Sequence, residues 1–593
     1  MHSMVLAVVS ALTFQANLSS PDDFLRRVQA AARQGLAETA ALFRDPQDAR
    51  YLRQIAGGRT AGLDVRMIPA PPGWKNVGSY WLVFSRVQDI ESEYDAVYRV
   101  NQTSGGLTIG AEIEEAEASK TASIIGSVAK VRLDPPHRSV AVTTHLSLRN
   151  QGGRALVFRL NLPYHLDQPD VIVAGDKVPQ PKAGSWVRAG GLLVKWDTRT
   201  TTAVDLAYSG VPGGEDRVGD KVAYVTAWWI PSIGRLPHTS KVSIEAPKDW
   251  VVRSEGIEVK PRSYDCTIPI SFPKVVAGRF ELAAERKDAK GRVFRSWQFA
   301  PLDRKRAEFD VKRMAEMAEF YDEKLTPWPF PGYECFDGIG YYGIESYSYT
   351  ILAPSISSRY VGHEMGHTYF GGLAPCAYVK DTWNEGVTTY VDDVLTGRNI
   401  DQPLEQALRN AETIHTPLSQ MSLAWGEGDE SYWRGAYVMK MLEAEIGAPK
   451  VLEGLRRLIK GQVGKETTWD SLRPYFEAAG GKQLDWFWRQ WIDGGTFPTV
   501  EIVSASQSSA PTADSKQATL VTIKLKQSGT APFRIRIPVV ATNGELEYAS
   551  EVILDRAEAI VEIKCETPVR HIVLRPLGYT LSKAGASVEV ARP

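Results

Sequence analysis

The stretch V-G-H-E-M-G-H-T-Y-F-G-G, residues 361–372, places two histidines four positions apart with a glutamate directly after the first. On an α-helix, residues four apart lie on one face, so the imidazoles of His363 and His367 can converge on one ion. Glu364 stands beside that face, where its carboxylate can reach a water on the ion. With 9 histidines in 593 residues, the pattern arises by chance in roughly one such chain in a hundred. We therefore expect a metal centre, against the alternative of a helix with solvated histidines.

A second predicted helix, in D-T-W-N-E-G-V-T-T-Y-V-D-D at 381–393, offers a third ligand. Glu385 is the expected donor, because two imidazoles and one carboxylate leave the fourth zinc position open for water. The alternative is a capping box, since Thr382 and Glu385 also fit the pattern S/T-x-x-E. Asp392 follows seven residues later on the same helical face, and we expect it to hold a ligand imidazole by a hydrogen bond.

Length and charge limit the classes of protein to be considered. A chain of 593 residues is longer than one hydrophobic core supports, so we expect three or four domains. The formal net charge of -1 gives no electrostatic reason for binding nucleic acid or an anionic membrane. No apolar run reaches membrane-spanning length, so no integral membrane association is expected.

The N-terminus carries an apolar run at residues 4–12, about the length of a signal-peptide core. We expect a signal segment at residues 1–16 and export to the periplasm or the medium. A cytoplasmic location stays open because no Lys or Arg precedes the run. The 4 cysteines contain no C-x-x-C pair and do not settle the compartment.

Changes in hydrophobic period divide the chain into four expected parts of an α+β multidomain protein. Residues 1–58 are predicted to form a helical lead-in, and residues 59–300 an antiparallel β domain in which Val140, Val142, Leu146 and Leu148 alternate inward. Residues 301–497 are predicted to be mostly helical, and residues 498–593 to form a small β-sandwich. The Ser-rich run at 504–516 is expected to be a long hairpin loop within that sandwich.

Two motifs extend the pattern to a family resemblance. H-E-M-G-H-T-Y-F-G-G-L and W-N-E-G-V-T-T-Y-V resemble the paired zinc motifs of the gluzincin aminopeptidases, the family of aminopeptidase N and leukotriene hydrolase. In that family 18 residues separate H-E-x-x-H from the ligand glutamate of W-L-N-E-G, whereas 17 residues, 368–384, intervene here. The resemblance implies an N-terminal saddle-like β domain, a thermolysin-like catalytic domain and a C-terminal β-sandwich. It also implies one zinc ion held by His363, His367 and Glu385.

The same resemblance assigns two further residues. G-Y-Y-G-I-E-S-Y-S-Y-T-I-L is similar to the family's G-x-M-E-N strand, so Glu345 is expected to bind the free amino group of a peptide substrate. S-Y-W-R-G-A-Y is similar to the family's Y-x-K-G segment, so Tyr432 is expected to stabilise the tetrahedral intermediate, with Arg434 in place of lysine. The alternatives are a surface carboxylate for Glu345 and a packed aromatic for Tyr432.

These observations predict a zinc-dependent aminopeptidase in which Glu364 is the general base. A departure from the family pattern leaves a second interpretation of the function open. The region Y-V-T-A-W-W-I-P resembles the family's W-F-P-x-x-D-E-P, but the D-E-P is absent from it. No second amine-binding residue is found in the sequence. A zinc endopeptidase or oligopeptidase of the same fold is therefore an alternative. A non-catalytic relative that acts as a binding scaffold is another. The side-chain preference and the oligomeric state are not predicted.

Overall fold

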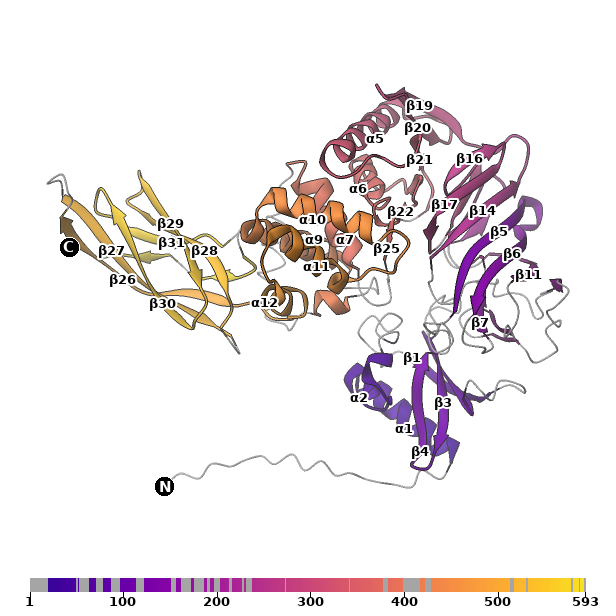
Figure 1. Cartoon of the computed structure of the whole chain (residues 1–593), viewed down its shortest axis with the longest axis horizontal. Coiled ribbons are helices and arrows are strands. Elements are labelled where there is room, and N and C mark those ends of the chain that lie inside the picture. Colours follow the sequence, from indigo (N-terminus) through magenta and orange to yellow (C-terminus); the bar gives the residue numbers. More distant parts are fainter. Residues whose placement is uncertain are drawn as a thin grey trace.

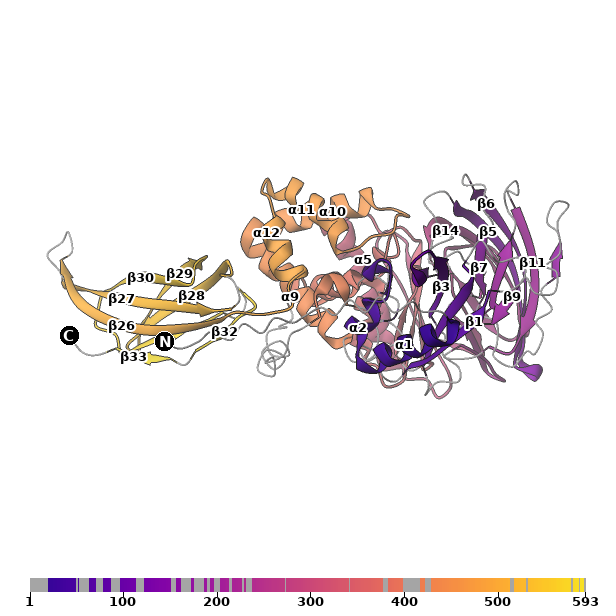
Figure 2. The same ribbon diagram turned by 90° about the horizontal axis from the view of Figure 1, so that it is seen from below.

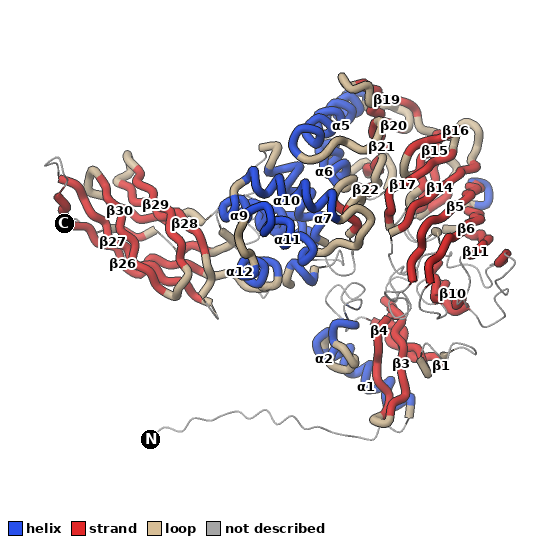
Figure 3. Tube along the Cα trace, in the orientation of Figure 1, coloured by secondary structure: helices blue, strands red, loops and turns tan. Residues whose placement is uncertain are grey.

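The structure is a computed structural model of the chain. It describes residues 20–49, 52, 63–70, 78–86, 96–112, 122–150, 156–160, 172–174, 186–188, 192–196, 203–212, 216–226, 229–230, 237–271, 273–340, 342–376, 382–397, 416–421, 428–511, 517–529, 532–576, 580–585 and 587–590. The expected signal segment at 1–16 lies outside these residues. Strands gather at both ends of the molecule and helices in the middle (Figure 3). The expected α+β class, with antiparallel sheets and a separate helical region, is confirmed at this level.

The N-terminal part is a small unit in which helices cover one four-stranded antiparallel sheet. Helix α1 contributes Phe24 and Val28 to one hydrophobic core, in which they pack with Val65, Tyr98 and Ile109 of the sheet. Helices occupy much of residues 20–49, the described part of the predicted lead-in, and they share their core with the strands that follow residue 58. The elements are α1 (Pro21–Gln34), α2 (Leu36–Ala40), η1 (Pro46–Ala49), β1 (Leu63–Pro69), β2 (Tyr80–Arg86), β3 (Ala96–Thr103) and β4 (Gly106–Glu112).

A larger β region follows, with a seven-stranded sheet in the order β16-β17-β14-β5-β6-β11-β8 facing a four-stranded sheet in the order β12-β13-β18-β15. All its pairs are antiparallel except β14 with β5. Val140, Val142, Leu146 and Leu148 are buried as the alternation predicts. The strands are β5 (Ala122–Asp134), β6 (Ser139–Asn150), β8 (Ile172–Ala174), β11 (Ala203–Gly210), β12 (Arg217–Val218), β13 (Val222–Val225), β14 (His238–Glu245), β15 (Val251–Ser254), β16 (Ile257–Lys260), β17 (Ser263–Ile270) and β18 (Val275–Gly278), beside a small sheet of β7 (Leu156–Leu160), β10 (Leu192–Trp196) and β9 (Trp186–Arg188).

A mixed five-stranded sheet connects this β region to the helices. Its order is β19-β20-β21-β23-β22, and β20 pairs in parallel with β21. One sheet therefore crosses the boundary expected at residue 300. Among the described residues, strand β22 lies at the edge of the sheet and pairs with β23 alone, and α6 lies beside it. The strands are β19 (Glu281–Lys287), β20 (Val293–Gln298), β21 (Gly332–Asp337), β22 (Gly343–Glu345) and β23 (Tyr349–Leu352).

The helical region packs on that sheet and shares one hydrophobic core with it (Figure 1). Helix α5 begins at its cap Asp303, whose side chain accepts from Arg306 N, and it ends before the predicted prolines. None of the helices in the described part of the chain combines the length and apolar character needed to cross a membrane. The helices are α5 (Arg304–Lys324), α6 (Val361–Gly366), α7 (Trp383–Thr389), η6 (Tyr390–Val394), η7 (Leu418–Gln420), α9 (Gly428–Ile446), α10 (Ala448–Gly461), α11 (Trp469–Gly480), α12 (Asp485–Phe487) and η8 (Trp488–Ile492).

The C-terminal part is a sandwich of two four-stranded sheets, which extends away from the helices in both views (Figures 1 and 2). The expectation of a long loop at 504–516 is wrong for residues up to Pro511, because these residues continue β26 and pair with β27. One sheet contains β30 (Glu558–Cys565), β27 (Gln517–Ser528), β26 (Thr499–Pro511) and β32 (Lys583–Ala584), and the other β29 (Glu547–Leu554), β28 (Ile535–Thr542), β31 (His571–Leu574) and β33 (Val588–Glu589).

Candidate metal centre and active site

The two histidines lie at the end of α6, a helix of 6 residues that is just long enough to align them. His363 is within the helix and His367 is its C-cap residue with helical backbone angles. The Nε2 atoms of His363 and His367 lie 3.1 Å apart. The i, i+4 spacing thus brings both rings to one point, as predicted.

Glu385, in the first turn of α7, completes the cluster. Its Oε2 lies 3.3 Å from His363 Nε2 and 3.2 Å from His367 Nε2. Thr382, the N-cap of α7, makes no side-chain cap hydrogen bond, so the capping-box alternative does not describe this carboxylate. The three donor atoms are all buried and mutually close.

These separations match those of a tetrahedral metal site. Three ligand atoms at about 2.0–2.1 Å from one ion, at tetrahedral angles, lie about 3.3 Å from one another. The observed separations are 3.1, 3.2 and 3.3 Å. Two imidazoles and one carboxylate are also a donor set typical of zinc. The residues therefore fit a single divalent cation.

Neighbouring groups orient the ring of His367. Its Nδ1 lies 3.0 Å from the carbonyl oxygen of Phe370, which accepts the Nδ1 proton and leaves Nε2 with a lone pair towards the cluster. Asn384 Nδ2 donates to Glu385 Oε1 at 3.2 Å. The motif analysis missed Asn384, although it stands in the W-N-E-G run, where an amide next to a ligand was the available signal.

Electrostatics inside the cluster favour a bound cation. Burial opposes protonation of His367, but the adjacent Glu385 carboxylate outweighs it and raises the pKa of His367 to about 10. Burial also opposes ionisation of Glu385, yet the charge of His367 and hydrogen bonds from both histidines hold the pKa of Glu385 well below its usual range. The cluster stabilises positive charge at its centre, which a metal ion can supply in place of the proton.

Two further carboxylates line the pocket beside the cluster, Glu364 from α6 and Glu345 from the edge strand β22. A β-carbon on Gly343 would lie 2.1 Å from Glu364 Oε1, so glycine in the edge strand β22 leaves room for that carboxylate. Residues two apart in a strand point to the same face, so Glu345 points to the side of β22 on which Glu364 lies. Burial raises the pKa of Glu364 to about 7.

Tyr432 reaches the cluster from α9. Its ring stacks on that of His363, with centroids 5.5 Å apart and planes at 28°. Burial and the nearby carboxylates of Glu385, Glu364 and Glu345 raise the pKa of Tyr432 well above its ordinary value, so the hydroxyl keeps its proton. A protonated phenol is a hydrogen-bond donor at neutral pH.

Asp392 lies behind α6. Its Oδ1 accepts from Arg313 Nη2 at 2.5 Å, and a β-carbon on Gly362 would lie 2.5 Å from the same oxygen. The carboxylate is therefore packed against the helix residue that precedes His363. The expected hydrogen bond from a ligand imidazole to Asp392 stays a prediction.

All seven residues predicted from the sequence line one pocket with a volume of ≈ 300 Å³. The motifs did not identify Tyr360, Thr389, Asp393 and Trp433, which also line it. Three of them lie within the quoted motif stretches and Tyr360 directly precedes one, but residue type and spacing did not single them out as lining the pocket. The complete lining is Tyr342, Gly343, Glu345, Ile356, Tyr360, His363, Glu364, His367, Glu385, Thr389, Asp392, Asp393, Tyr432 and Trp433.

Comparison with known proteins finds aminopeptidases among the similar sequences. No model of a known protein family matches it. It is 22% identical over 262 residues to endoplasmic reticulum aminopeptidase 1 of Homo sapiens, covering 38% of this chain and 28% of the relative. It is 23% identical over 307 residues to aminopeptidase M1 of Arabidopsis thaliana, covering 44% of this chain and 35% of the relative. The matched stretch thus spans about a third of the length of these curated relatives.

Solved structures extend the likeness to most of the chain. Aminopeptidase A of Legionella pneumophila, solved in complex with aspartic acid, superposes with a TM-score of 0.62 at 14% identity, over 79% of this chain and 60% of that chain. A mutant M1 zinc metallopeptidase of Deinococcus radiodurans superposes with a TM-score of 0.52 at 16% identity, over 64% and 96%. The fold is that of this class of metallopeptidase. The resemblance to the gluzincin aminopeptidases, drawn from two short motifs, is confirmed.

Proposed function

We propose that this chain is a zinc-dependent aminopeptidase that removes N-terminal residues from peptides. The observation that carries the proposal is the convergence of His363, His367 and Glu385 in a pocket that Glu364 and Glu345 also line. Such a set combines a metal centre, a base and a group able to bind an amine. The proposal includes the layout of the family, with a saddle-like N-terminal β domain, a thermolysin-like catalytic domain and a C-terminal β-sandwich.

His363, His367 and Glu385 hold the ion. Bound there, zinc acts as a Lewis acid that lowers the pKa of a water towards about 7 and polarises the scissile carbonyl. Glu364 accepts a proton from the attacking water at its carboxylate and delivers it to the leaving amine.

Tyr432 and Glu345 orient the substrate and stabilise charge. The Tyr432 hydroxyl donates to the oxyanion that develops on the scissile carbonyl. The Glu345 carboxylate binds the ammonium group of the peptide, so that the first peptide bond is presented for cleavage. The position of both groups in the lining of the pocket supports these roles.

Two substrates test this function on the purified protein loaded with zinc. We expect hydrolysis of an aminoacyl fluorogenic amide and little cleavage of an internally quenched, N-blocked peptide. Comparable cleavage of both would favour the endopeptidase. Cleavage of neither, with one zinc bound, would favour the non-catalytic scaffold. The pocket argues against a scaffold, because an open metal site with a carboxylate beside it costs desolvation that binding another protein does not require.

Two substitutions separate the roles. Glu364→Gln should retain zinc and lower kcat by about 100-fold or more, the usual contribution of general-base catalysis. Glu316→Gln, an exposed change on α5, is the control and should have no effect.

Glu345→Ala should raise KM for substrates with a free N-terminal amine and leave cleavage of N-acetylated peptides unchanged. Equal effects on both substrates would remove the amine-binding role.

A further inference from the structure

Glu255 is a buried carboxylate outside the pocket, in the turn between β15 and β16. It is 1% exposed. The next residue, Gly256, has φ +90°, and a β-carbon there would lie 2.3 Å from the carbonyl oxygen of Asp265. Only glycine fits that conformation and that approach. The turn is therefore held firmly against β17, and the position of Glu255 is fixed by the backbone.

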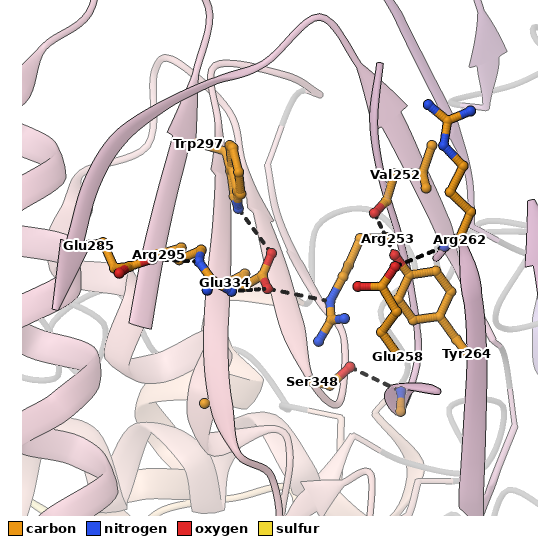
Figure 4. Close-up of polar contacts among 12 residues, drawn as sticks. Val252, Arg253, Glu258, Arg262, Tyr264, Glu285, Arg295, Trp297, Glu334 and Ser348 are labelled. Atoms are coloured by element: carbon orange, nitrogen blue, oxygen red, sulfur yellow. Dashed lines mark hydrogen bonds and ion pairs between the residues drawn. The ribbon is translucent and has the colours of Figure 1, made fainter. Parts of the chain in front are cut away.

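Glu255 binds the segment that directly follows Glu345. Ser346 Oγ donates to Glu255 Oε1, and the backbone N–H of Tyr347 donates to Glu255 Oε2 at 3.0 Å. The N–H of Gly256 donates to Ser348 Oγ at 3.0 Å, the contact drawn from Ser348 in Figure 4. Three consecutive buried residues, 346–348, are thus hydrogen-bonded to one turn: Ser346 and Tyr347 donate to it, and Ser348 accepts from it.

Lys274 adds a contact to Glu345 itself. Its ammonium donates to the carbonyl oxygen of Glu345 at 2.5 Å and lies 5.7 Å from the centre of the Tyr347 ring. Ser254 Oγ donates to the Lys274 carbonyl at 2.8 Å, which ties the residue before β18 to the residue before the turn. The ammonium also offsets the charge of Glu255, whose burial would otherwise be costly.

The other side of the same segment contacts the metal-binding region. Thr368 Oγ1 donates to the Tyr347 carbonyl at 2.9 Å, and Tyr347 OH donates to the Gly371 carbonyl at 3.2 Å. Thr368 directly follows His367. Segment 345–348 is therefore fixed between the turn that contains Glu255 and the chain that leaves the metal ligands.

We propose that Glu255 is a positioning residue for amine recognition: with Lys274, it holds segment 345–348 so that Glu345 lies at a set distance from the metal ligands. This inference rests on the proposed function, because it takes Glu345 as the group that binds the substrate ammonium. Glu255 itself is buried and does not touch substrate. Its effect is expected on substrate binding more than on the chemical step.

Contacts that do not involve Glu255 also link β15 to β21 and β17. Arg253, two residues earlier, points towards Glu334 of β21, with Nε 3.9 Å from Oε1, and its guanidinium lies over the Tyr264 ring (Figure 4). Trp297 Nε1 donates to the same Glu334 at 2.9 Å. We therefore expect Glu255→Ala to fold.

Kinetics on the zinc-loaded enzyme test the proposal. Glu255→Ala should raise KM for an aminoacyl amide about tenfold, the factor that ~1.4 kcal/mol of lost binding gives, with kcat changed less than threefold. Glu255→Gln should recover much of the loss, because an amide can accept from Tyr347 N and donate to Ser346 Oγ. Glu258→Ala, in the exposed strand β16 that follows the turn, is the control. An unchanged KM in Glu255→Ala, or a fall in kcat alone, would overturn the proposal.

Hydrogen exchange provides a reading that does not need activity. Amide protection at 345–348 should fall at least tenfold in Glu255→Ala and stay unchanged in Glu258→Ala. If the wild-type protein hydrolyses no aminoacyl amide, the proposed function fails and exchange alone decides whether Glu255 holds the segment. If the wild type is active but Glu255→Ala keeps both KM and protection, the positioning role fails and the aminopeptidase remains.

Discussion

Gly386 and Gly435 meet backbone to backbone where α7 crosses α9. A β-carbon on either glycine would lie 2.7 Å from the Cα of the other. Gly386 directly follows Glu385, and Gly435 lies three residues after Tyr432. Each glycine is therefore within one helical turn of a residue that lines the pocket. The close approach of the two helices is what brings a metal-ligand helix and the tyrosine helix to one site.

Gly435→Ala is therefore predicted to disturb stability and activity together. The added methyl group forces α7 and α9 apart, and overpacking of this kind costs about 1–3 kcal/mol. We expect a lower midpoint of thermal unfolding and a lower kcat, since Tyr432 moves relative to Glu385. Gly105→Ala is a matched control, because the nearest atom to a β-carbon there is Thr103 Oγ1 at 3.8 Å. Normal stability and kcat in Gly435→Ala would show that the contact tolerates separation.

Zinc content is the second prediction. Metal analysis of the purified protein should find one zinc per chain, and His367→Ala should lose it because two donors bind zinc far more weakly than three. Chelation should lower the thermal midpoint of the wild type and leave that of the variant unchanged, since a ligand stabilises only a fold that binds it. His145→Ala, an exposed histidine beside Asp205, should retain the metal. Stoichiometric zinc in His367→Ala would refute the ligand assignment.

The sequence predicted the parts of the site that follow from short-range rules. Two histidines four apart must share a helical face, and α6 shows them converging on one point. The choice between ligand and cap for Glu385 depended on the direction of one side chain, which spacing leaves open. In the structure Glu385 contacts both histidines while Thr382 provides no side-chain cap; these contacts favour the ligand, whose assignment stays a prediction.

Long-range pairing was not predictable in the same way. Ser-rich residues up to Pro511 extend β26 because β27 pairs with them, although their composition favours a loop. The parallel pairing of β20 with β21 likewise carries one sheet across residue 300. Glu255 gives no local signal either, since its partners Ser346 and Tyr347 lie about ninety residues later in the chain. Tertiary contacts outweigh local preference at all three places.

Tyr432→Phe tests the oxyanion donor. The ring should keep its stacking on His363, so zinc content and the unfolding midpoint should match the wild type. Loss of the hydroxyl should lower kcat by about 100-fold or more with little change in KM, because the hydrogen bond forms in the transition state. Steady-state kinetics on an aminoacyl amide give both values. If kcat stays within threefold of the wild type, another group donates to the oxyanion.

The pH dependence of stability provides a prediction away from the pocket. Asp310 of α5 is fully buried and accepts from Ser296 Oγ at 3.1 Å. Burial, with a contribution from nearby Asp337, raises the pKa of Asp310 to about 7. The folded-state pKa is thus above the unfolded value near 3.8. This group's contribution to the free energy of unfolding is full below about pH 4 and is lost as the pH rises to about 7.

Asp310→Asn mimics the protonated acid and should remove that loss. At pH 8 the free energy of unfolding of the variant should exceed that of the wild type by roughly 1–4 kcal/mol. At pH 5 this gain should be smaller. Urea denaturation of both proteins at the two pH values measures the difference. Asp322→Asn on the same helix is the contrast. Burial opposes ionisation there, but Lys290 and Arg292 lower the pKa of Asp322, so this carboxylate is ionised at pH 5 and at pH 8. Removing its charge should destabilise the protein by about the same amount at both pH values. A loss of stability in Asp310→Asn of similar size at pH 5 and pH 8 would mean that Asp310 is ionised in the fold at both pH values, because the variant would then have removed a charge that nearby Arg306 stabilises.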